Sequence, residues 1–126
     1  MLWRYLRPVP ELYSAKSPKL REIAERIITQ YGLVVQHGPF AGLQYIRDAI
    51  DSQLVPKLLG AYEAELHDAF TGLIKAGHKV VINIGCAEGY YAVGLARTLP
   101  DARVYAFDPD PRAQIMPETS DPKWGC

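Results

Sequence analysis

Two glycines and an aspartate have the types and the spacing that could bind a ligand. Gly85 and Gly89 follow the apolar run Val80–Ile84, whose β-branched composition is typical of a buried parallel strand. Asp108 ends a second apolar run, Val104–Phe107. Glycines at a strand end let a ligand approach the main chain, and a carboxylate at the end of the next strand can accept hydrogen bonds from a ribose diol. The pattern predicts a site for a nucleotide-like ligand.

A helix must connect the two runs. Ala92, Val93, Ala96 and Leu99 recur at helical spacing between them, and Pro100 follows. The segment 80–108 is therefore predicted to form one strand–turn–helix–strand unit with parallel strands, and the helix N–H groups face the turn. The alternative is a βαβ unit whose glycines only make a tight turn.

The turn also resembles a known family. Asn83–Gly89 has the sequence Asn-Ile-Gly-Cys-Ala-Glu-Gly, which is similar to the first motif of the class I S-adenosylmethionine-dependent methyltransferases, acid-x-Gly-x-Gly-x-Gly. The outer glycines match, whereas Ala87 replaces the middle glycine and Asn83 replaces the acid. Asn83 still offers an amide donor and a carbonyl acceptor but carries no negative charge.

The resemblance implies roles for these residues. The turn from Gly85 through Ala87 to Gly89 would wrap the methionine part of S-adenosyl-L-methionine, and Asp108 would hold the ribose hydroxyls. In the family an acidic residue before the first strand often reaches the cofactor, and Glu63 is our candidate for it. Glu65 is the second candidate, and the alternative is that both are exposed carboxylates on a helix. No residue is assigned as a catalytic base, because the family places it after the second strand.

A dinucleotide site is the alternative to the methyltransferase site. Its pattern, Gly-x-Gly-x-x-Gly, measured from Gly85, needs glycines at positions that Ala87 and Tyr90 occupy. The methyltransferase spacing is therefore favoured over that of a dinucleotide-binding oxidoreductase.

The preceding 77 residues are predicted to form a helix–hairpin–helix region. Ser17 and Pro18 suit a helix start, and Gly32 suits its end. Glycine and proline between two short apolar runs predict the hairpin. We expect a helix over 18–31, a hairpin over 33–46, a short helix over 47–54 and a long helix over 56–76.

The fold class that follows is α/β, an incomplete Rossmann-like methyltransferase fold with one βαβ unit. Residues 1–77 form the N-terminal region, 78–114 the partial cofactor-binding unit and 115–126 an irregular tail. The resemblance stops after the second of about seven strands, so we expect a methyltransferase fragment, truncated and inactive alone. The alternative is a non-catalytic remnant or interaction module. Exposed strand edges predict self-association, and the methyl acceptor is not defined.

Composition excludes several other classes. The 126 residues are 48% hydrophobic and 22% charged, which is typical of a globular protein. Lys plus Arg equals Asp plus Glu at 14 each, so no electrostatic footprint for nucleic acid is present. Two cysteines and three histidines lack metal-ligand spacing. Without an apolar stretch of membrane-spanning length or a signal peptide, a cytoplasmic location is expected.

Overall fold

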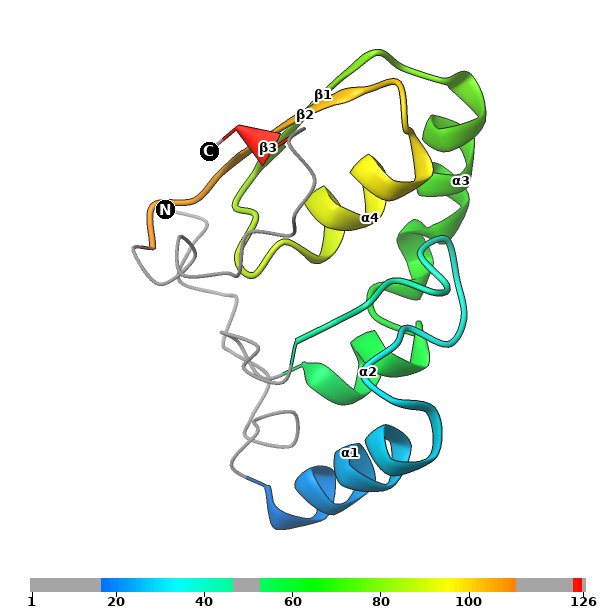
Figure 1. Ribbon diagram of the computed structural model, residues 1–126, viewed down its shortest axis with the longest axis vertical. Helices are drawn as coiled ribbons and strands as arrows, with labels where there is room; N and C mark the ends of the chain where they lie inside the picture. Colours follow the sequence, from blue (N-terminus) through cyan, green and yellow to red (C-terminus); the bar gives the residue numbers. More distant parts are fainter. Residues whose placement is uncertain (1–16, 47–52, 111–123, 126) are drawn as a thin grey trace.

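The computed structural model describes residues 17–46, 53–110 and 124–125 of a mixed α/β chain (Figure 1). In the second half of the chain, helices alternate with the strands of a small parallel sheet. The elements are α1 (Pro18–Tyr31), α2 (Leu54–Leu59), the 3₁₀ turn η1 (Ala64–Leu66), α3 (His67–Ala76), β1 (Val80–Ile84), α4 (Tyr90–Thr98), β2 (Arg103–Phe107) and β3 (Trp124–Gly125).

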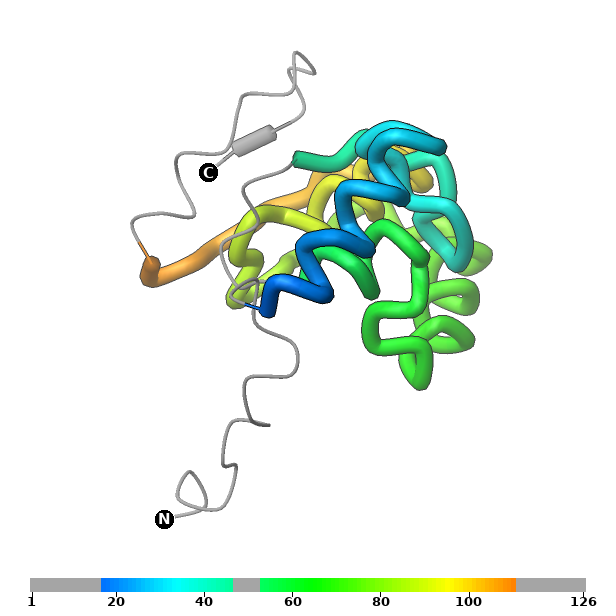
Figure 2. The backbone as a smooth tube through the Cα atoms, turned by 90° about the horizontal axis from the view of Figure 1, so that it is seen from below, coloured from blue at the N-terminus to red at the C-terminus, as the bar shows by residue number. Residues whose placement is uncertain are grey.

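The predicted first helix is confirmed as α1. Pro18 occupies its first turn, where a missing N–H costs no hydrogen bond, and Gly32 ends it with its N–H donating to the Ile28 carbonyl. The helix packs against α2. It lies at the end of the molecule away from the sheet (Figures 1 and 2). Among the described elements, α1 therefore supports α2 rather than the sheet.

The predicted hairpin is confirmed as a short antiparallel loop between α1 and α2. Val34 and Gln44 form an antiparallel bridge. The Val35 N–H donates to the Leu43 carbonyl at 2.9 Å, and the Tyr45 N–H donates to the Leu33 carbonyl at 2.7 Å. The loop carries Val35, Leu43 and Tyr45 into the core.

The prediction of one long helix over 56–76 is wrong. The segment is divided into α2, η1 and α3, because Gly60 adopts a left-handed backbone with φ +75° and ends α2. A Cβ on Gly60 would lie 1.9 Å from the His37 carbonyl oxygen, so only glycine fits against the hairpin. Glu63 is left-handed as well, with φ +46°. Of the predicted short helix, residues 47–52 lie outside the described residues, and α2 begins at Leu54.

The predicted βαβ unit is confirmed. β1 and β2 are parallel, with Val80 opposite Arg103 and Ile82 opposite Tyr105, and α4 connects them. β3 pairs in parallel with β2, which gives the strand order β1-β2-β3. Of the predicted irregular tail, residues 115–123 and 126 lie outside the described residues. The two residues of β3 are too few to show an alternating pattern in the sequence.

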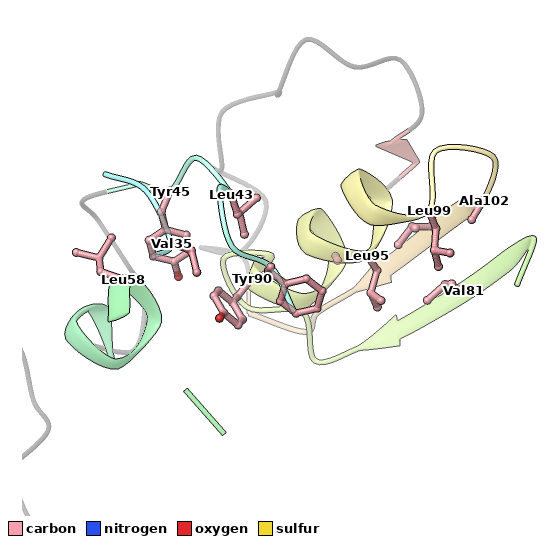
Figure 3. Close-up of a cluster of buried hydrophobic side chains, with 12 residues drawn as sticks. Val35, Leu43, Tyr45, Leu58, Val81, Tyr90, Leu95, Leu99 and Ala102 are labelled. Atoms are coloured by element: carbon pink, nitrogen blue, oxygen red, sulfur yellow. The ribbon is translucent and has the colours of Figure 1, made fainter. Parts of the chain in front are cut away.

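One cluster of buried side chains spans the hairpin, α2, α4 and the sheet (Figure 3). Val81 and Val104 project from the strands toward the α4 side, where Leu95 and Leu99 meet them. Tyr90 lies between this group and the side chains of the hairpin and α2 in Figure 3. The N-terminal region and the βαβ unit therefore share a core.

The opposite face of the sheet is apolar and exposed. Val80, Ile82 and Ile84 are 59%, 62% and 80% exposed, and Phe107 is 53% exposed. These side chains alternate with the buried positions of the same strands, as the two faces of a pleated sheet require. Among the described residues, no helix is long and apolar enough to cross a membrane.

The contact between Gly94 and Phe40 predicts opposite effects for two Gly→Ala substitutions. A Cβ on Gly94, inside α4, would lie 2.5 Å from the Phe40 ring, whereas a Cβ on Gly72, inside α3, would meet nothing within 4 Å. Overpacking costs about 1–3 kcal/mol and helix propensity returns about 1 kcal/mol. Gly94→Ala should therefore lower the free energy of unfolding by up to about 2 kcal/mol, and Gly72→Ala should raise it by about 0.5–1 kcal/mol. Denaturant unfolding measures both, and a stabilising Gly94→Ala would contradict this packing.

Candidate functional site

The turn between β1 and α4 contains three left-handed residues at alternate positions. Gly85, Ala87 and Gly89 have φ of +77°, +45° and +91°. Glycine adopts this backbone freely, but Ala87 does so at a cost of about 1–2 kcal/mol, because its Cβ crowds the following carbonyl. Gly89 then caps the N-terminus of α4, and its N–H donates to the Cys86 carbonyl at 2.7 Å. The surroundings must hold this turn in place.

Asp108 is one of the groups that hold it. Its Oδ2 accepts a hydrogen bond from the Ala87 N–H at 2.7 Å, and its Oδ1 accepts one from the Asp110 N–H at 2.8 Å. The Gly85 N–H also donates to the Phe107 carbonyl at 2.7 Å. The structure thus brings together the glycine turn and the aspartate that the sequence predicts as one site. Each Asp108 oxygen keeps a further lone pair for a ligand hydroxyl.

Asn83 is half-buried near the carboxyl end of β1, in the strand that leads into the turn. Its Oδ1 is buried and has no hydrogen-bond partner among the described residues. A buried acceptor without a donor costs about 1–3 kcal/mol, so a donor that reached this oxygen would be bound favourably.

The Glu63 side chain contacts the first turn of α4 at Tyr91. Its Oε2 accepts a hydrogen bond from the Tyr91 hydroxyl, two residues after the end of the glycine turn. Burial and then the neighbouring Glu63 carboxylate raise the pKa of Tyr91, so the phenol remains a neutral donor. Glu63 stands in a left-handed turn rather than on the predicted helix, because α2 ends at Leu59.

Glu88 is a site residue that the sequence analysis missed. It is the fourth residue of the turn and only 1% exposed, and its Oε1 accepts hydrogen bonds from Lys57 Nζ and the Tyr45 hydroxyl. Burial alone would raise the pKa of Glu88, but the hydrogen bonds from Lys57 and Tyr45 and the lysine charge outweigh burial and hold it below its usual value. The sequence signal for this site was Lys57, because a charged residue inside the apolar run Leu54–Leu59 needs a buried partner of opposite charge.

Aromatic rings surround the first turn of α4. Tyr91 stacks on Phe70 with ring centres 4.6 Å apart, and Tyr90 meets Phe40 edge-on at 5.5 Å. Tyr62 also meets Tyr90 edge-on at 5.5 Å. Burial raises the pKa of Tyr90 to about 12. These contacts fix the direction of α4 and therefore where the glycine turn ends.

The arrangement offers hydrogen-bonding groups to a polar ligand. The N-terminus of α4 and the remaining lone pairs of Asp108 both lie at the carboxyl edge of the sheet. Within residues 17–46, 53–110 and 124–125, no group of three His, Cys, Asp or Glu side chains could hold a metal ion. Comparisons with protein-family models, with curated proteins and with solved structures find no match for the chain.

Because the Ala87 backbone is left-handed, we expect the substitution Ala87→Gly to raise the free energy of unfolding. Ala87→Gly removes the strain of about 1–2 kcal/mol and costs about 0.5–1 kcal/mol of unfolded-state entropy, so the free energy of unfolding should rise by about 0.5 kcal/mol. Ala69→Gly, an exposed position inside α3, is the control and should lose about 1 kcal/mol. Denaturant midpoints test the pair. Equal losses in the two variants would show that Ala87 carries no strain.

Proposed function

We propose that this chain is part of a class I S-adenosylmethionine-dependent methyltransferase with a Rossmann-like fold, and that it binds the cofactor at the Gly85–Gly89 turn and Asp108. One observation carries the proposal. The three left-handed residues, Gly85, Ala87 and Gly89, stand at the three glycine positions of the acid-x-Gly-x-Gly-x-Gly motif. The backbone thus needs glycine-like conformations where the resemblance expects glycines.

The buried side chain of Tyr90 disfavours a dinucleotide site. The dinucleotide pattern would place its third glycine at Tyr90. Tyr90 is instead the first residue of α4, is 4% exposed and packs among the aromatic rings. The close helix–strand packing of dinucleotide sites requires glycine at this position, and a tyrosine side chain does not suit it.

Each candidate residue has a role in the proposed site. Asp108 would accept hydrogen bonds from the ribose hydroxyls with the lone pairs that the Ala87 and Asp110 amides leave free. Asn83 Oδ1 has no hydrogen-bond donor among the described residues, and it would accept a hydrogen bond from the methionine part. Glu63 would contribute its second oxygen, because Oε2 is held by Tyr91. When bound, the cofactor would supply an electrophilic methyl group, and the turn would orient it.

A second candidate function is a non-catalytic interaction module, and the exposed apolar face of the sheet favours it. Val80, Ile82, Ile84 and Phe107 are more than half exposed on this face, which Arg103 and Tyr105 of β2 share. Among the described residues β1 pairs with β2 alone. An open strand edge beside an apolar face is suited to pairing with a second copy of the chain.

Ligand titration separates these candidates. We expect S-adenosylhomocysteine to bind saturably in isothermal titration calorimetry, and NAD not to bind. Asp108→Asn should weaken S-adenosylhomocysteine about tenfold, because a charge-assisted hydrogen bond worth about 1.5 kcal/mol or more is lost while the amide oxygen can still accept the Ala87 N–H. Asp101→Asn, in an exposed ion pair with Lys79, is the matched control and should bind as the parent does. A parent chain that binds no S-adenosylhomocysteine, or an Asp108→Asn variant of unchanged affinity, would refute the proposed site.

A further inference from the structure

Three segments that are distant in the sequence meet at one carboxylate oxygen. Glu88 Oε1 accepts hydrogen bonds from Lys57 Nζ on α2 and from the Tyr45 hydroxyl on the hairpin. The three residues, here called the ion cluster, are 1%, 5% and 9% exposed for Glu88, Lys57 and Tyr45. Figure 3 shows Tyr45 between α2 and Tyr90, at the hairpin end of the core. The cluster ties the glycine turn to the N-terminal region.

The lysine of the ion cluster is held from two further sides. Lys57 Nζ lies 4.7 Å from the centre of the Tyr62 ring and 5.8 Å from that of Tyr90. Such distances allow cation–π attraction, which strengthens when the cation is removed from water. The Lys57 charge is therefore balanced by one carboxylate and by the faces of two rings.

Stability alone gives no reason for a buried ion pair at this place. Removing two charges from water costs about as much as their attraction returns, and apolar side chains of the same volume are often as stable. Apolar side chains, however, cannot make the directional hydrogen bonds of a carboxylate. A carboxylate that accepts two hydrogen bonds fixes the position of its own backbone, and Glu88 directly follows Ala87, the strained residue of the turn. Asp108 holds the Ala87 amide from the other side.

We propose that Glu88 is a positioning residue: through Lys57 and Tyr45 it fixes the Gly85–Gly89 turn in the conformation that binds ligand, without touching the ligand itself. The effect on affinity rests on the proposed function. The effect on the turn does not, because the turn can be observed without any ligand.

The test removes the ion cluster without leaving a buried charge unpaired. In the triple variant Tyr45→Phe/Lys57→Met/Glu88→Leu every polar atom of the cluster is replaced by apolar volume, so the thermal midpoint should stay near that of the parent or rise. Amide hydrogen exchange of Ala87 and Gly89, followed by NMR, should become about tenfold faster or more. The Arg103 amide, which donates to the Lys79 carbonyl beside β1, should keep its rate. Affinity for S-adenosylhomocysteine should fall about tenfold or more, since the competent turn is populated less.

Two further variants keep the outcome decisive. Lys79→Met/Asp101→Leu removes an exposed ion pair whose charged atoms are 3.6 Å apart and should change neither exchange nor affinity. If the triple variant does not fold, Glu88→Gln keeps the side-chain volume and one oxygen acceptor but removes the negative charge that faces Lys57, and it should speed exchange at the same two amides. Parent-like exchange at Ala87 and Gly89 in the folded variants would overturn the inference. Faster exchange in a chain whose parent binds no S-adenosylhomocysteine would instead leave the positioning role standing and refute the proposed function.

Discussion

Ala87 has a left-handed backbone that the elements on both sides of the turn must hold in place. An alanine with φ of +45° persists only where the contacts of the surrounding residues stabilise the turn by more than the strain energy. Two carboxylates provide this. Asp108, at the end of β2, accepts the Ala87 N–H, and Glu88, the next residue of the turn, reaches back to Lys57 and Tyr45. The turn is thus held from the sheet on one side and from the N-terminal region on the other.

This arrangement gives the N-terminal region a structural purpose. The hairpin and α2 supply Tyr45 and Lys57, and the hairpin also supplies Phe40, whose ring lies against Gly94 in α4. Because the same core continues to Val81 and Val104 on the strands, movement of the hairpin would be transmitted to the turn. The βαβ unit and the preceding elements therefore act together on one site.

Features fixed by nearby residues could be predicted from the sequence. The β-branched run 80–84, the glycines after it and the helical spacing that follows were sufficient for β1, the turn, α4 and β2, and Asp108 was placed beside the turn correctly. Distant contacts could not be predicted. Gly60 breaks the expected helix because the His37 backbone lies against it, and Glu88 finds its partners 31 and 43 residues earlier in the chain. Within the motif Glu88 looked like a spacer, since nothing local indicated that its side chain would be buried.

The proposed site requires that a ligand with a ribose and an amino-acid part contacts the turn itself. An NMR titration of the ¹⁵N-labelled chain with unlabelled S-adenosylhomocysteine measures this contact. We expect saturable shifts of the Gly85, Cys86, Ala87, Gly89 and Asp108 amides, with the amides of α1 unchanged. Absence of any saturable shift, or shifts confined to residues away from the turn, would contradict it.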